Sequence, residues 1–179
     1  MVEKNHLKSK EVWLIYYKKD SGKPRISYND AVDEALCFGW IDSTVKSIDG
    51  AKFCQRFSPR RKGSPCSEMN KHRAIRMIKE KRMTPSGLSA LEGTLGHDAK
   101  VHQGTIKHTK AWKVPADILQ TLKKDPQIWK HFQKFPLPYK RIRVGWIDAV
   151  RYRPDVFKQR LNYFLKRTAK NKRFGMIQK

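Results

Sequence analysis

Acidic residues are scarce in this sequence. Its 16 Asp and Glu stand against 40 Lys and Arg, which gives a formal net charge of +24 at pH 7. Self-repulsion at this charge opposes compaction, and the usual partners of so basic a chain are nucleic acid, an anionic membrane surface or another polyanion. Because charge specifies neither a fold nor a partner, the alternative is a soluble basic protein that binds polyanions only non-specifically.

Cysteines and long apolar runs are also few. The three cysteines, Cys37, Cys54 and Cys66, are odd in number and form no CxxC motif, so we predict no disulfide framework, which suits a reducing cytosol. The apolar run at residues 12–17 is too short for a signal peptide, and no segment approaches the roughly 18 apolar residues of a membrane span. We therefore expect a cytoplasmic protein without a transmembrane segment, of an oligomeric state that the sequence does not specify.

Motifs typical of catalysis and metal binding are missing too. The sequence has no glycine-rich dinucleotide motif, no serine nucleophile elbow and no HExxH pattern, and the histidines at 97, 102 and 108 have no paired cysteines. We therefore predict no metal site, no cofactor and no enzymatic activity. A weaker alternative is an enzyme on an anionic small molecule, with Asp42, Arg60 and Cys66 in one pocket.

The remaining composition is that of a folded protein with a modest core, since 39% of residues are hydrophobic and 11% aromatic. The residue patterns predict a mainly α (α+β) fold, helical with one β-hairpin inserted in the N-terminal half and a helical C-terminal region. We expect an N-terminal helix/hairpin/helix domain over 1–92, a loop or linker over 93–113 and a basic C-terminal region with a flexible tail over 114–179.

Two segments of the N-terminal half carry the clearest patterns. A central helix follows Ser27, with apolar residues at three- and four-residue steps along one face. Residues 44–58 predict the hairpin, because Asp49-Gly50 favours a type I′ turn and the second strand alternates between Phe53, Gln55 and Phe57 on one side and polar residues on the other. The shorter run at 11–18 fits a helix or a strand, and its acidic start and basic end favour a helix.

The other helices are predicted from caps and prolines. Ser67 caps a helix from Glu68 to about Arg82, and Thr84-Pro85 begins a short one. Four helices follow in the C-terminal region, at 115–122, from Asp125-Pro126, at 139–153 and at 155–169. The string Gly-Trp-Ile-Asp occurs at 39–42 and again at 145–148, which is too short to indicate a repeat.

Three strings, Glu-Ala-Leu-Cys-Phe-Gly-Trp-Ile-Asp at 34–42, Arg-Phe-Ser-Pro-Arg-Arg at 56–61 and Arg-Met-Thr-Pro-Ser-Gly-Leu at 82–88, resemble the signature of the bacteriocin-protection, YdeI/OmpD-associated family. Residues 114–168 resemble that family's second helical region. The resemblance implies a small cytosolic, mainly helical protein without a known enzymatic reaction and with a link to envelope stress. The sequence departs from the family's pattern at Cys66, where the family has Trp, and at residues 155–157, where it has Glu-Thr-Arg.

The loop from Pro59 to Pro65 is densely cationic and leads into a helix N-terminus at Ser67. Free backbone N–H groups at a helix start, with arginine side chains nearby, suit phosphate or carboxylate, and an adjacent tryptophan can stack a base or sugar. Basic helices at 68–82 and 139–167 would extend this surface. We predict that the residues that bind an anion or nucleic acid are Trp40, Arg56, Arg60, Arg61, Lys62, Ser64, Asn70 and Lys71.

Two other interpretations of these residues stay open. The loop can be a solvated turn, with Trp40 buried in the core. Alternatively, the protein acts in envelope stress through a protein partner that binds an exposed aromatic patch containing Trp40, Trp129 or Trp146.

Overall fold

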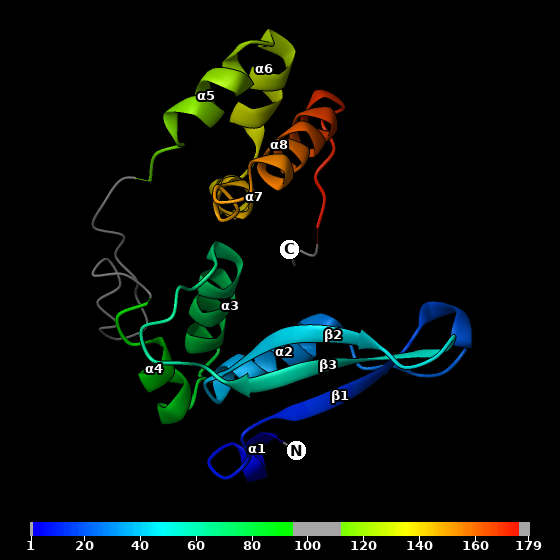
Figure 1. Cartoon of the computed structure of the whole chain (residues 1–179). Helices are drawn as coiled ribbons and strands as arrows, with labels where there is room; N and C mark the ends of the chain where they lie inside the picture. The colour runs from blue at the N-terminus through cyan, green and yellow to red at the C-terminus, as the bar shows by residue number, and fades with distance from the viewer. Residues whose placement is uncertain (1, 95–111, 176–179) are drawn as a thin grey trace. The chain divides into compact units, whose positions relative to one another are not determined.

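The computed structural model of the chain describes residues 2–94 and 112–175 (Figure 1). These residues form two compact units, the first made of 2–66 and 73–94 and the second of 67–72 and 112–175. Helices together with a small three-stranded antiparallel sheet confirm the predicted α+β class. The predicted linker lies mostly outside the described residues, and the domain boundaries remain a prediction. None of the described helices is long and apolar enough to cross a membrane.

The predicted helix at 11–18 was wrong, because this segment forms strand β1 (Val12–Tyr17). It pairs antiparallel with β3 (Lys52–Pro59), from Val12 opposite Phe57 to Tyr17 opposite Lys52. Six residues rich in β-branched and aromatic side chains suit a strand, and the pairing satisfies the backbone groups that face β3. The sheet therefore has the order β1-β3-β2, with β2 (Trp40–Ser47) on the other side of β3.

The hairpin between β2 and β3 is present, but its turn differs from the predicted type I′. Neither Asp49 nor Gly50 has the positive φ that a type I′ turn requires. The Asp49 side chain instead accepts hydrogen bonds from the backbone N–H groups of Ala51 and Lys52, both at 2.7 Å. An aspartate that bonds to backbone a few residues ahead closes the loop without a left-handed residue.

The core of the first unit lies between the sheet and helix α2 (Tyr28–Cys37), which runs behind the sheet in Figure 1. As predicted, Gln55 and Phe57 of β3 point inward and are buried. Phe57 meets an apolar face of α2 formed by Val32, Ala35 and Leu36. This face has the helical spacing seen in the sequence, so local periodicity and packing agree.

Helix α3 (Glu68–Lys79) is fastened to α2 by a buried ion pair. Arg73 donates to the Asp33 carboxylate at 3.1 Å, and Arg76 bonds to the other oxygen of the same group. Arg73 is only 6% exposed and Asp33 only 2%, so both partners of this pair are buried. The helix also ends before the predicted Arg82, since Lys81 adopts a positive φ of 57°.

Helix α4 (Pro85–Leu91) packs end-on against the last turn of α2. Thr84 caps α4 as predicted, accepting from the Gly87 N–H, and its hydroxyl donates to the Cys37 carbonyl at 2.6 Å. The chain before β1 begins with the short helix α1 (Val2–Asn5). After it, the ring of His6 lies 4.9 Å from that of Phe38. A short 3-10 turn, η1 (Lys19–Ser21), follows β1.

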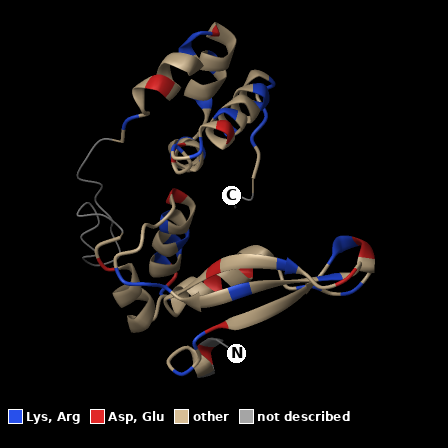
Figure 2. Ribbon diagram, viewed as in Figure 1, with Lys and Arg blue, Asp and Glu red and all other residues tan. Residues whose placement is uncertain are grey.

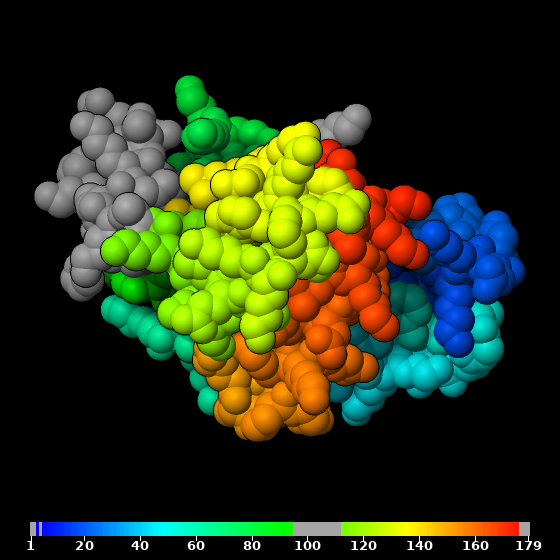
Figure 3. All heavy atoms as spheres, turned by 90° about the horizontal axis from the view of Figure 1, so that it is seen from above, coloured from blue at the N-terminus to red at the C-terminus, as the bar shows by residue number. Residues whose placement is uncertain are grey.

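The second unit contains helices α5 (Ala116–Lys123), α6 (Pro126–Lys134), α7 (Leu137–Asp148) and α8 (Pro154–Ala169). Asp125 caps α6 as predicted, accepting from two backbone N–H groups. Helix α7 begins earlier than predicted and ends five residues before the expected Arg153. In the space-filling view of Figure 3, the side chains of α5, α6 and α8 lie against one another, over a core of buried residues: Ile118, Leu122, Phe132, Phe135, Tyr139, Val144, Ile147 and Phe164.

Candidate functional site

The cationic loop after β3 is shaped from within by Arg60. Its backbone N–H donates to the Gly39 carbonyl at 2.9 Å, and its guanidinium donates to the carbonyl oxygens of Ser64 at 2.6 Å and of Pro65 at 2.8 Å. Only 8% of Arg60 is exposed. The predicted role of Arg60 as a direct anion ligand is therefore corrected, because carbonyl oxygens already occupy its guanidinium and its buried position shields it.

These hydrogen bonds of Arg60 clamp the loop, and the next two side chains lie on its outer surface. Arg61 and Lys62 are exposed, and neither side chain forms an ion pair or hydrogen bond with a described residue. The turn closes with the Ser64 N–H donating to the Arg61 carbonyl at 3.1 Å, and Gly63 supplies a φ of +75° that a side chain would strain. Two adjacent cations thus project from a fixed turn.

Two other residues of the first unit that were predicted to bind an anion or nucleic acid already have partners within the protein. The Arg56 Nε donates to Glu11 at 2.6 Å on the outer side of the sheet. Trp40 is 1% exposed and donates its indole N–H to the His6 carbonyl at 3.2 Å. The predicted stacking of a base on Trp40 is corrected, because the indole belongs to the core and offers no free face.

The last two predicted residues, Asn70 and Lys71, belong to the second unit. Ser67 caps α3 as predicted, since its hydroxyl accepts from the Asn70 N–H at 3.2 Å. Lys71 pairs with Glu68 at 2.9 Å, one turn earlier on the same helix. The start of α3 therefore already carries the Glu68 carboxylate, and this negative charge weakens the attraction of the helix start for an added anion.

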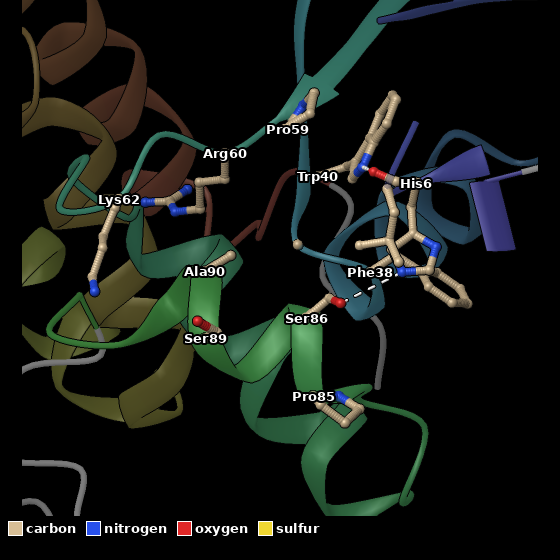
Figure 4. A pocket seen from close by; sticks show the side chains of 12 residues that line it. His6, Phe38, Trp40, Pro59, Arg60, Lys62, Pro85, Ser86, Ser89 and Ala90 are labelled. Atoms are coloured by element: carbon tan, nitrogen blue, oxygen red, sulfur yellow. Dashed lines mark hydrogen bonds between the residues drawn. The ribbon is translucent and has the colours of Figure 1, made fainter. Parts of the chain in front are cut away.

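An open pocket of about 540 Å³ adjoins the clamped loop (Figure 4). In that view Arg60 and Lys62 lie on one side, His6 and Phe38 lie on the other, and Ser86 of α4 lies between them. The Ser86 hydroxyl and the His6 ring are 3.4 Å apart. The pocket joins an apolar floor to a cationic side, but its lining contains neither a carboxylate nor a thiol.

This lining counts against the enzyme with Asp42, Arg60 and Cys66 in one pocket, since it includes Arg60 alone of the three. Asp42 instead accepts hydrogen bonds from the Tyr28 hydroxyl and the Gln55 amide, both at 2.8 Å. Burial, followed by the charge of Asp42, raises the pKa of Tyr28 well above its usual range. Asp42 thus orders the sheet against α2.

The exposed aromatic patch predicted for a protein partner is not formed by the three named tryptophans. Trp40 is buried, as described above. Trp129 and Trp146 are partly buried against the core of the second unit, where the Arg160 guanidinium lies 4.7 Å from the Trp146 ring centre.

Most cations of the chain lie outside the salt bridges of the described residues. Those salt bridges involve eight of the 40 basic side chains: Lys52, Arg56, Lys71, Arg73, Arg76, Arg82, Arg141 and Arg151. Helix α8 carries a row of exposed polar residues at four-residue steps, Lys158, Asn162 and Lys166, and Lys170 follows at its C-terminal cap. Figure 2 shows how the basic residues are distributed over the helices and strands. Residues four apart share one helix face, so α8 presents a basic stripe.

The outer face of the sheet, which carries Trp13 and Tyr17, was not predicted, because the pattern at 11–18 favoured a helix. The enrichment of residues 12–17 in β-branched and aromatic side chains was the signal that would have identified the strand. The pocket was not predicted either, because its lining joins segments that are far apart in the sequence.

Two families match the chain. Residues 1–90 match the family described as Domain of unknown function (DUF8412), and residues 111–171 match the family described as Bacteriocin-protection, YdeI or OmpD-Associated. The second match confirms the predicted resemblance over the C-terminal part, whereas the motifs at 34–88 fall within the first family. No curated protein and no solved structure matches the chain significantly.

Proposed function

We propose that the protein, which belongs to the family described as Domain of unknown function (DUF8412) and matches the bacteriocin-protection family over residues 111–171, binds a polyanion through its basic loop and basic helices, with nucleic acid as the leading candidate. The observation that carries this proposal is the loop held by Arg60, which keeps Arg61 and Lys62 exposed and without a salt bridge to any described residue. Because Arg60 fixes the loop backbone, phosphate binding does not have to order that backbone as well, which favours binding.

The chain charge and the α8 stripe support the same proposal. A net charge of +24 raises the local concentration of any polyanion around the protein. The stripe supplies phosphate contacts along one helix face in the second unit, independently of the loop in the first.

The test compares two charge reversals of equal size. Arg61→Glu with Lys62→Glu changes the loop, and Lys123→Glu with Lys124→Glu changes another adjacent, exposed pair at the end of α5. Binding of a labelled DNA duplex at low salt is measured by fluorescence anisotropy. The loop variant should bind at least about tenfold more weakly than the α5 variant.

Equal weakening in both variants would show that only total charge matters, which is the non-specific alternative. An unchanged affinity in the loop variant, with weakening after Lys158→Glu and Lys166→Glu, would move the site to α8.

A further inference from the structure

The outer face of the sheet in the first unit bears three apolar side chains of β1 in a row. Alternation along the strand and its register with β3 place Trp13, Ile15 and Tyr17 on the face away from α2. Ile15 is 55% exposed. Within the described part of the first unit, α2 covers the opposite face only (Figure 1).

Both aromatic rings of this face lie beneath a lysine ammonium group. The Lys46 Nζ is 4.7 Å from the Trp13 ring centre, and the Lys23 Nζ is 5.1 Å from the Tyr17 ring centre. Arg56 stands opposite Trp13 across the β1–β3 ladder. Cations over aromatic faces show that the rings are accessible to a polar group and that positive charge gathers above them.

One carboxylate sets the position of the indole. Glu11 accepts from the Trp13 Nε1–H at 3.0 Å and from the Arg56 Nε–H at 2.6 Å. This fixes the indole edge and neutralises Arg56 in part. Lys46 has no salt bridge to any described residue. The positive charge on this face therefore exceeds the negative charge of Glu11.

Rings and cations on one exposed surface match the chemistry of single-stranded nucleic acid. Each base has a flat face that stacks on an aromatic side chain, and each phosphate needs a nearby cation. Trp13 and Tyr17 are four residues apart on one strand, about 13 Å by the strand rise, which leaves room for one base on each ring. A duplex offers no free base faces, so it would meet only the cations.

We propose that this outer face binds single-stranded nucleic acid, with bases stacked on Trp13 and Tyr17 and phosphates held by Lys23 and Lys46. On binding, the lysines above the rings move aside to the phosphates as the bases take their places. The inference rests on the proposed function for the choice of nucleic acid, but it assigns base contacts to a surface other than the loop.

The test uses the full chain with a labelled oligothymidylate and with a duplex of equal length. Trp13→Ala and Tyr17→Ala should each weaken oligothymidylate binding about 5- to 150-fold, the range for loss of one stacked base. Duplex affinity should change less than about twofold, because phosphate contacts remain. Tyr152→Ala, which removes a tyrosine that is 79% exposed in the second unit, is the control and should leave both affinities unchanged.

Ile15→Glu serves as a second variant if Trp13→Ala fails to fold, since the Ile15 side chain is already largely exposed. A carboxylate at this position should repel phosphates and weaken oligothymidylate binding about tenfold. If all three variants bind oligothymidylate as the wild type does, the sheet face is not the site, although salt-dependent duplex binding would still support the proposed function. If neither nucleic acid binds at low salt, both proposals are wrong.

Discussion

The Arg60 guanidinium donates to the Ser64 carbonyl oxygen at 2.6 Å, across the base of the cationic loop. An arginine that the sequence suggests as a ligand is thus the residue that gives the loop its shape. Its neighbours Arg61 and Lys62 are the cations left for a partner.

Replacing Arg60 with alanine should loosen the loop and destabilise the first unit. Hydrogen bonds from a charged group contribute about 1.5–3 kcal/mol, and the Ser64 and Pro65 carbonyls would lose their donor. Urea unfolding should report a loss of this size, together with weaker duplex binding. Arg61→Ala is the control and should weaken binding without lowering the unfolding free energy.

The Asp33 carboxylate should prove one of the most important polar groups for stability. It is 2% exposed and holds both Arg73 and Arg76, so Asp33→Ala would leave a buried arginine without its counter-charge. Breaking a buried pair in this way costs about 3–5 kcal/mol. Asp30→Ala, at an exposed position on the same helix, should change the unfolding free energy by less than about 0.5 kcal/mol. Similar small effects in both variants would refute the assigned role of the ion pair.

Gly87 allows α4 to approach the end of α2. A Cβ at this position would lie 2.3 Å from the Cys37 carbonyl oxygen, so Gly87→Ala must push the two helices apart. Overpacking of this kind costs about 1–3 kcal/mol, and thermal unfolding would show the loss. Gly50→Ala is the matched control, because nothing lies within 4 Å of its added Cβ.

Alkaline pH should destabilise the first unit through Tyr16. Burial, and then the charge of Asp42, raises the pKa of Tyr16 to about 12. Since the folded state favours the neutral phenol, this stability is fully present below the unfolded pKa of about 10 and falls as pH rises towards 12. The Tyr16 hydroxyl is buried without a described partner, so Tyr16→Phe should keep the fold at neutral pH and lose less stability in alkali. Identical pH profiles for the two proteins would contradict this cause.

Local signals in the sequence predicted the caps, the central helix, the inward face of the hairpin and the helical C-terminal region. They failed where the structure of a segment depends on its pairing with residues distant in the sequence. The string Gly-Trp-Ile-Asp shows why: at 39–42 it turns into strand β2 through the positive φ of Gly39, whereas at 145–148 it ends helix α7. The same four residues adopt both structures, because pairing with β3 is available only to the first copy.

The candidate site was predictable only as a segment. Sequence placed the exposed cations in the loop, and Arg61 and Lys62 are there. That Arg60 turns inward, that Trp40 is buried and that Arg73 meets Asp33 depend on contacts between residues distant in the sequence, which composition and periodicity do not encode.

The salt dependence of duplex binding tests the central claim most directly. If the protein neutralises about six phosphates, the affinity plotted against salt on logarithmic axes should have a slope of about −5, and Arg61→Glu with Lys62→Glu should reduce its magnitude by about two. Absence of binding at low salt, or an affinity that does not change with salt, would contradict the account.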